Sequence, residues 1–274
     1  MREFTDHDVS ALVDGTDLLD EVARCLADLG RGDASQTAKQ TLPLAGPGFL
    51  LSLSGIVPRL GLAATKWASY VPGGAGRPGR STATVVGSDA RTGEPVALMS
   101  GMAATRLRTA ATAVAVARAA RPGGGPRRVT LIGFGPTNRA VLRAARTAFA
   151  LGDVRVLVRS TDSTRALAAE GIDATTDPAT VAGSDLVFSA TGATAPVADL
   201  NDLAAGGIAV SLDGDATWRR DPEVPVLRDH GRAPAVPRLL AGLEPVPAGR
   251  LLLDVAGCAV TDVALLAVLL EATR

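Results

Sequence analysis

The segment "VTLIGFGPTNRAVLRAA" at residues 129–145 has the residue types of a phosphate-binding turn. Gly133 and Gly135 directly follow an apolar stretch and precede a stretch whose apolar residues have helical spacing. Gly133 permits a tight turn, and Gly135 lets the backbone approach a pyrophosphate at the positive N-terminus of the next helix. Pro136 suits the first helical turn, where its missing N–H costs little. A plain structural turn is the alternative, because a bare G-x-G is a weak signal.

A second apolar stretch strengthens the prediction of a dinucleotide site. It ends about twenty residues later, at Arg159, Ser160 and Thr161. NAD sites usually carry an acid here for the ribose hydroxyls, whereas a guanidinium and two hydroxyls suit a 2′-phosphate. We therefore predict that NADP(H) is preferred and that NAD(H) is possible; a solvated arginine in an arginine-rich chain is the alternative. The predicted cofactor-binding residues are Gly133, Gly135, Pro136, Thr137, Asn138, Arg159, Ser160, Thr161 and Thr191, with Asn138 standing where the fingerprint has Gly or Ala.

Proton transfer and carboxylate binding have few candidates in this chain. Only Lys39 and Lys66, among 28 basic residues, are lysines. A lysine can lose its proton when burial shifts its pKa, which an arginine cannot do. Asp215 in "DGD" follows a predicted strand of an open α/β sheet, and such sheets bind ligands beyond the carboxyl ends of their strands. Arg108 can hold a carboxylate through two parallel hydrogen bonds. The alternatives are a surface lysine, a plain turn and a structural ion pair.

The elements that would position these residues divide into two predicted domains. Residues 1–120 contain an N-terminal helical stretch, then short apolar runs broken by Gly and Pro that predict a β-rich domain, and an alanine-rich helix at 103–120. The segment "RPGGGP" at 121–126 marks a boundary. Residues 121–250 alternate strands with helices before an irregular part at 221–250, which predicts a Rossmann-type, doubly wound parallel sheet. Residues 251–274 are expected to complete the first domain. The predicted fold class is α/β.

Composition argues against several classes of function. The formal net charge is zero, with 28 basic and 28 acidic side chains, so nothing favours binding to nucleic acid or to an anionic membrane. The apolar run near the C-terminus is too short to span a bilayer, and its flanks Asp262 and Glu271 suit a docked helix. The polar N-terminus lacks the apolar region of a signal peptide. Two isolated cysteines and two isolated histidines offer neither a disulfide framework nor metal-site spacing. We expect a cytoplasmic protein.

Several of these motifs together resemble the ornithine cyclodeaminase/mu-crystallin family. The resemblance lies in "TKWASYVPGG", "GSDARTGEPVALMSGMAATRLRTAA", "LIGFGPTN", "GGIAVSLDGDATWRRDPE" and "LLLDVAGCAVTDVALL", and it covers nearly the whole chain. It implies a homodimer formed through the β-rich domain and an active site between the domains. It also implies that Lys66 is the active-site lysine, that Arg108 binds the substrate carboxylate and that Asp215 is the catalytic aspartate.

The chain departs from this family at positions that would bind substrate. The family's early carboxylate-binding arginine is missing, which leaves Lys39 and Arg80 as candidate replacements. The acid that cyclodeaminases carry upstream of the lysine falls within "LSLSG", which has no carboxylate. This loss argues against ornithine cyclodeamination, because no acid remains there to act on the substrate amine. Arg159 replaces the acid that cyclodeaminases keep for NAD, and in this respect the chain is closer to ketimine reductases similar to mu-crystallin, which use NADPH.

The sequence therefore predicts an NADPH-dependent reductase of a C=N bond in a small imine or amino-acid-like substrate, or the reverse amine oxidation. Within enzymes, the alternatives are a cyclodeaminase-like lyase and an amino-acid or opine-type dehydrogenase. From a different class, a non-catalytic protein could hold NADPH and a small ligand without turnover, as mu-crystallin is thought to do in some settings.

Overall fold

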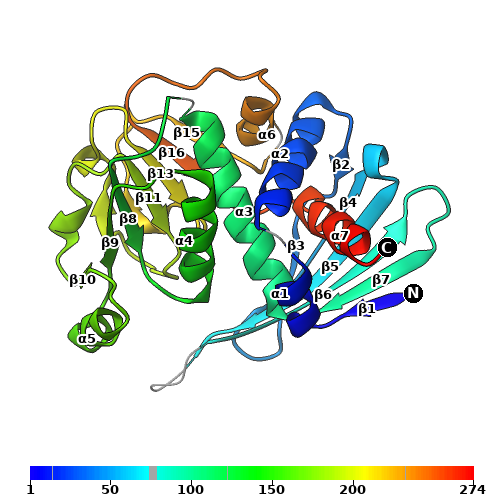
Figure 1. Ribbon diagram of the computed structural model, residues 1–274. Helices are drawn as coiled ribbons and strands as arrows, with labels where there is room; N and C mark the ends of the chain where they lie inside the picture. The colour runs from blue at the N-terminus through cyan, green and yellow to red at the C-terminus, as the bar shows by residue number, and fades with distance from the viewer. Residues whose placement is uncertain (14, 74–78, 122, 232) are drawn as a thin grey trace. The chain divides into compact units, whose positions relative to one another are not determined.

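The computed structural model describes residues 1–13, 15–73, 79–121, 123–231 and 233–274 (Figure 1). Contacts between Cα atoms divide the chain into two compact units, Met1–Arg108 with Cys258–Arg274, and Thr109–Gly257. These limits differ from the predicted boundaries after residues 120 and 250. The alanine-rich helix α3 (Met102–Ala120) begins in the first unit and continues in the second. The Gly- and Pro-rich segment that follows α3 therefore does not coincide with the boundary between the two units.

A mostly antiparallel sheet carries the first unit, and the β-rich character predicted for this part is confirmed. Its strands lie in the order β1-β7-β6-β5-β4-β2, with β3 also paired to β4, and β1 is parallel to β7. The elements of the unit before α3 are β1 (Arg2–Phe4), α1 (Asp6–Leu12), α2 (Gly15–Arg31), β2 (Ser35–Gln36), β3 (Gln40–Pro43), β4 (Phe49–Val57), the 3-10 turn η1 (Pro58–Leu60), β5 (Leu62–Val71), β6 (Arg80–Asp89) and β7 (Pro95–Ser100). The C-terminal helix α7 (Val260–Ala272) belongs to the same unit.

One face of this sheet is covered by α7. Side chains of a strand alternate between the two faces, so Lys66 on β5 is buried while the adjacent Trp67 is 49% exposed. Gly87 lies under α7, where an added Cβ would be only 2.3 Å from Cδ2 of Leu266. A Cβ at this position would displace the Leu266 side chain, so glycine allows the helix to pack close to the sheet here. The close approach brings the first turn of α7 to the face on which Lys66 points.

The second unit contains the predicted Rossmann-type sheet, which is confirmed. All paired strands of this sheet are parallel, in the order β10-β9-β8-β11-β13-β16-β15. The strands are β8 (Arg128–Ile132), β9 (Asp153–Leu157), β10 (Ala174–Thr175), β11 (Leu186–Ser189), β13 (Ile208–Ser211), β15 (Val226–Arg228) and β16 (Leu251–Asp254). Connecting elements are α4 (Pro136–Ala148), α5 (Thr161–Ala169), η2 (Pro178–Val181), β12 (Ala198–Asp199), η3 (Leu200–Asp202), η4 (Asp215–Thr217), β14 (Trp218–Arg219) and α6 (Ala235–Leu240).

The two faces of the parallel sheet are covered differently. On one face Leu131 and Val156 pack against Leu142 of α4 and Leu167 of α5. On the other face the core residues from outside this sheet include Val181 of η2, Leu200 of η3 and the fully buried Trp218 of β14. The segment at 221–250 was predicted to be irregular, and this was wrong in part. It contains β15, which pairs with β16 at the edge of the sheet, and the short helix α6.

None of the helices in the described ranges combines the length and the apolar character needed to cross a lipid bilayer.

Candidate active site

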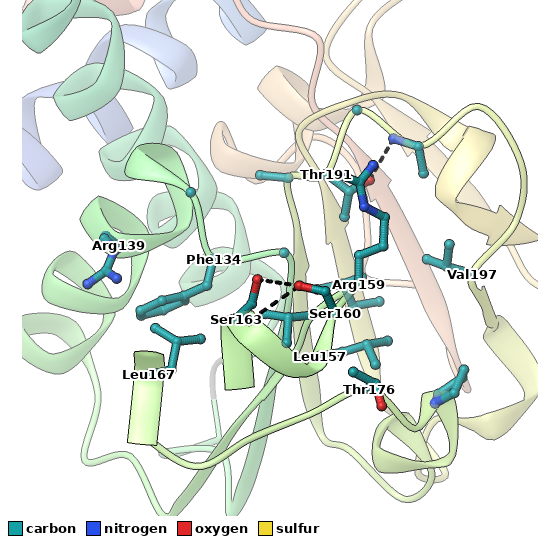
Figure 2. A pocket seen from close by; sticks show the side chains of 18 of the residues that line it. Phe134, Arg139, Leu157, Arg159, Ser160, Ser163, Leu167, Thr176, Thr191 and Val197 are labelled. Carbon is teal, nitrogen blue, oxygen red and sulfur yellow. Dashed lines mark hydrogen bonds between the residues drawn. The ribbon is translucent and has the colours of Figure 1, made fainter. Parts of the chain in front are cut away.

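A cavity of about 690 Å³ opens at the carboxyl ends of β8, β9 and β11 in the second unit (Figure 2). The strand order reverses between β8 and β11, which is where open α/β sheets bind dinucleotides. The predicted cofactor residues that line this cavity are Gly133, Gly135, Arg159, Ser160 and Thr191. The predicted residues that are not part of its lining are Pro136, Thr137, Asn138 and Thr161.

The turn after β8 has the backbone geometry that the two glycines indicated. Gly133 has a φ of 77°, and an added Cβ would lie 2.7 Å from the carbonyl oxygen of Ala190. Its N–H donates to the carbonyl of Leu157 at 2.8 Å, which ties the turn to the end of β9. Gly135 caps α4, Pro136 is at its start, and nothing lies within 4 Å of the position of a Gly135 Cβ. Open space thus remains in front of the positive end of α4.

Asn138 is turned away from the cavity and into the protein. Its side chain is fully buried, and its Nδ2 donates to the carbonyls of Ile132 at 2.9 Å and of Gly133 at 2.7 Å. The amide therefore holds the strand end and the glycine turn together. The role that the structure shows for Asn138 is to fix the shape of the turn.

The end of β9 presents polar side chains to the cavity. Arg159 and Ser160 are exposed there, and Ser160 caps α5 by accepting from the N–H of Ser163 at 3.3 Å. The two serine hydroxyls lie 2.9 Å apart (Figure 2). Ser163 was not among the predicted residues, although a serine three positions after an N-cap serine is a visible sequence signal.

Phe134 and Arg139 also line the cavity and were missed by the sequence prediction. The Arg139 guanidinium lies 4.8 Å from the centre of the Phe134 ring, within the range of a cation–π interaction. Arg139 also pairs with Glu170, at 2.5 and 2.9 Å. Among the described residues, the cavity lining contains two arginines, Arg139 and Arg159, and no carboxylate.

The loop after β11 forms another side of the cavity. Thr191, Gly192 and Ala193 line it, and the carboxylate of Asp213 accepts hydrogen bonds from the backbone of this loop. Asp215, which was the predicted residue of the "DGD" motif, begins η4, and its side chain lies outside the described part of the structure. The first aspartate of the motif is therefore the one whose contacts are visible.

In the first unit, two of the predicted residues meet at an aspartate. Lys66 Nζ lies 2.9 Å from Oδ2 and 3.3 Å from Oδ1 of Asp262, and Arg108 Nε lies 3.3 Å from the same Oδ1. The three side chains are buried, at 3%, 2% and 9% exposure for Lys66, Asp262 and Arg108. The prediction from the sequence treated Asp262 only as a charged flank of an apolar helix.

The surroundings of Lys66 change its proton affinity. Burial, together with the charges of Arg108 and Lys39, lowers the pKa of Lys66 to about 8, although the hydrogen-bonded Asp262 acts in the opposite direction. Desolvation is the largest of these effects, because a buried ammonium loses its hydration. Lys66 can therefore exchange a proton near neutral pH.

The two candidate replacements for the missing arginine lie differently with respect to Lys66. Lys39 is exposed just before β3, and its charge is close enough to lower the pKa of Lys66. Arg80 is exposed at the first residue of β6 and pairs with Val71. Val71 is five residues along β5 from Lys66, which corresponds to about 17 Å of strand. The sheet thus separates Arg80 from Lys66.

Within the described ranges, His, Cys, Asp and Glu side chains form no group of three or more that could hold a metal ion.

The comparison with protein families matches most of the chain. The sequence model of the ornithine cyclodeaminase/mu-crystallin family matches residues 5–228. A comparison with curated proteins finds no match.

Three solved structures have the same fold as this chain. A Δ1-pyrroline-2-carboxylate reductase of Thermococcus litoralis, in complex with NADH and L-proline, has a TM-score of 0.86 at 20% identity and covers 100% of this chain and 97% of its own. A probable ornithine cyclodeaminase of Bordetella pertussis Tohama I has a TM-score of 0.85 at 20% identity, again with 100% and 97% covered. An archaeal alanine dehydrogenase dimer with bound NAD has a TM-score of 0.83 at 21% identity, with 100% and 96% covered. At such identities the similarity shows the fold alone.

Proposed function

Because this chain belongs to the ornithine cyclodeaminase/mu-crystallin family, we propose that it is an NADPH-dependent reductase of the C=N bond in small amino-acid-like imines, or that it catalyses the reverse amine oxidation. Reduction of a C=N bond adds a hydride to carbon and a proton to nitrogen. The proposal is carried by Lys66, a buried ammonium whose pKa of about 8 suits it to give up a proton near neutral pH.

The residues around the cavity of the second unit fit NADPH. The glycine turn leaves open space at the start of α4, where a pyrophosphate would be held by backbone N–H groups. Arg159 and the hydroxyls of Ser160 and Ser163 would hold the 2′-phosphate, and the absence of a carboxylate from the described lining favours this added negative charge. When bound, the cofactor supplies the hydride. NADH is the weaker candidate, because its ribose hydroxyls would meet no acid in this lining.

The first unit would supply the polar groups for the substrate. In the proposed reduction, Lys66 gives its proton to the substrate nitrogen, and Asp262 holds the ammonium in place beforehand. Arg108 is proposed to bind the substrate carboxylate, and its position beside the same aspartate keeps it close to Lys66. Lys39 would add positive charge on this side. Asp215 remains the candidate for a second acid or for the group that holds a cationic nitrogen.

We further propose that the active form is a homodimer joined through the sheet of the first unit. Trp67 alternates with Lys66 on β5, so it lies on the face of the sheet opposite to α7. Leu42 is 59% exposed and pairs with Leu50 of β4. Leu50 is two positions from Ser52, which pairs with Trp67, so Leu42 and Leu50 point to the same face of the sheet as Trp67. A face with an exposed tryptophan and leucines among serines and threonines is typical of an interface. The archaeal alanine dehydrogenase similar in fold is described as a dimer.

The test is whether imine substrates cause a net oxidation of the reduced cofactor. Cyclic ketimine carboxylates and NADPH are expected to be turned over with loss of the reduced-nicotinamide absorbance, and NADH should be used less well. The Lys66→Arg variant should bind NADPH and lose about 10²-fold or more of its turnover rate. The proposal would be refuted if no imine oxidised NADPH while ornithine gave proline without net change of cofactor, since a cyclodeaminase recycles its cofactor.

A cyclodeaminase is the second candidate because of the family and because one structure of the same fold is a probable ornithine cyclodeaminase. The stretch "LSLSG" at 51–55, which pairs with β5 beside Lys66, carries no carboxylate that could act on a substrate amine. This observation favours the reductase. A protein that holds NADPH without any turnover would differ from both, because the wild type and Lys66→Arg would then behave alike.

A further inference from the structure

One carboxylate fastens the loop after β11 to the loop after β13. Oδ2 of Asp213 accepts hydrogen bonds from the N–H of Thr191 at 2.5 Å, from the N–H of Gly192 at 3.1 Å and from the Thr191 hydroxyl at 2.8 Å. The same hydroxyl accepts from the N–H of Ala193 at 2.8 Å. Four bonds thus fix the conformation of residues 191–193, and all three of these residues line the cavity.

The carboxylate itself is held at the carboxyl edge of the sheet. Its Oδ1 lies 3.3 Å from the hydroxyl of Ser189 and 3.1 Å from the hydroxyl of Ser211, which are the last residues of β11 and β13. The Thr217 hydroxyl lies 3.2 Å from Oδ2. Both serines are fully buried. Asp213 is therefore a fixed point to which the loop is attached.

The loop has the form of an anion-binding nest that is filled from within. Gly192 has a φ of 66°, and consecutive N–H groups around such a residue point to one side and can bind an anion together. Here the anion is the side chain of Asp213. The N–H groups of Thr191 and Gly192 are therefore already bonded within the protein.

The position of this loop indicates which part of a dinucleotide it would meet. The two mononucleotide halves bind on either side of the point where the strand order reverses. Arg159 and Ser160 follow β9, on one side of β8, and residues 191–193 follow β11, on its other side. If Arg159 marks the adenosine half, the loop borders the space of the nicotinamide half.

We propose that Asp213 is a positioning residue for the nicotinamide half of the cofactor. It is not part of the cavity lining and acts through residues 191–193, whose backbone it holds. The inference rests on the proposed function, namely that this cavity binds NADPH. It goes beyond that function by assigning a residue that neither the glycine turn nor the lysine site contains.

The experiment measures by calorimetry the affinity of the protein for two probes in the absence of substrate. NADPH fills both halves, whereas adenosine 2′,5′-bisphosphate fills only the adenosine half with its 2′-phosphate. The Asp213→Ala variant is expected to bind NADPH about tenfold or more weakly, because several bonds to a charged acceptor are lost. Its affinity for adenosine 2′,5′-bisphosphate should equal that of the wild type, which also shows that the variant is folded.

Two matched variants separate positioning from other effects. Asp213→Asn can keep the oxygen that the loop uses and turn its NH₂ toward the hydroxyls of Ser189 and Ser211, so it should bind NADPH within about threefold of the wild type. Arg159→Ala should weaken both probes alike, since it acts on the adenosine half. Hydrogen exchange in the cofactor-free protein should be faster at the amides of Thr191 and Gly192 in Asp213→Ala and close to normal in Asp213→Asn.

The inference is overturned if Asp213→Ala binds NADPH as the wild type does, or if it loses both probes equally. An Asp213→Asn variant that is as weak as Asp213→Ala would overturn it as well, because charge and not geometry would then matter. Failure of the proposed function looks different: the wild-type protein itself would bind neither probe.

Discussion

Lys66 Nζ lies 2.9 Å from Oδ2 of Asp262, although 196 residues separate the two in the sequence. Both side chains are almost fully buried, and Arg108 shares the aspartate. One carboxylate thus stands between two cations in a place that water hardly reaches. Asp262 stabilises the protonated form of Lys66, which can act as an acid. Burial destabilises the same form, so that the proton is released near neutral pH.

The pH dependence of imine reduction should report the pKa of Lys66. The reaction needs the protonated ammonium, so kcat/KM is expected to be constant below about pH 8 and to fall about tenfold per pH unit above it. Lys66→Arg keeps the charge and cannot release the proton, so kcat should fall by about 10²-fold or more while NADPH binding is preserved. If kcat/KM of the wild type did not fall at alkaline pH, this role would be contradicted.

Replacing Asp262, the partner of Lys66, should change the pH at which activity begins to fall. Asp262 raises the pKa of Lys66, so in Asp262→Asn the pKa should fall and the loss of activity should begin at lower pH. The variant should also be less stable by about 3 to 5 kcal/mol, because it leaves buried cations without their carboxylate. Denaturant unfolding measures the stability and the pH profile measures the shift. If the variant kept the wild-type stability and the wild-type pH profile, Asp262 would neither stabilise the protein nor raise the pKa of Lys66.

The stability of the protein should rise between about pH 8 and pH 10.5 through Lys66. The pKa of this lysine is lowered in the folded protein from its ordinary 10.5, so within this window the unfolded chain binds the extra proton. Stability then increases with pH, by up to about 3 kcal/mol in total, as the folded state no longer buries a charge. The measurement is the difference in unfolding free energy between the wild type and Lys66→Met across this range. A difference that stays constant would exclude the shifted pKa.

Arg159 should decide the choice between NADPH and NADH. Arg159→Ala removes the cation proposed to hold the 2′-phosphate, so the dissociation constant of NADPH should rise by about 10-fold to 100-fold while that of NADH changes little. Arg165→Ala is the matched control, because Arg165 is an exposed arginine of α5 that pairs with Asp162 and does not line the cavity. Equal losses for both cofactors, or equal effects of both variants, would refute the assignment.

Trp67 should hold the proposed homodimer together. Trp67→Glu places a charge on the exposed face of the sheet, and burial of this charge between two copies would be costly. We expect the wild type to be a dimer and the variant to be a monomer of unchanged fold, as measured by light scattering and circular dichroism. Leu243→Glu is the control, since Leu243 is 51% exposed and belongs to the second unit. A monomeric wild type would contradict the proposal directly.

Patterns that act over a few residues predicted much of the fold. The order of strand, glycine turn and helix around Gly133 and Gly135 is confirmed, because backbone freedom and helix-end chemistry are local properties. The alternation of strands and helices gave the parallel sheet for the same reason. The pattern failed at β15, where a short strand between prolines and glycines is stabilised by its neighbour β16 and not by its own sequence.

The candidate site could be predicted only in part, because side-chain direction and partners depend on distant segments. Asn138 stands in the fingerprint, yet its amide points inward to two backbone carbonyls. Asp213 is the inconspicuous aspartate of "DGD", and its hydrogen bonds to the loop after β11 join residues more than twenty positions apart in the sequence.

The order of residues is enough to show that Lys66 is one of two lysines among 28 basic residues and to predict that a glycine turn opens a parallel sheet. Those facts follow from residue type and spacing. The contact of Asp262 with Lys66 and Arg108 depends on the tertiary structure, because the three residues belong to α7, β5 and α3 and only the packing of these elements brings them together. The tertiary structure also decided the pKa of Lys66, since desolvation is a property of the packed surroundings and not of the chain's order.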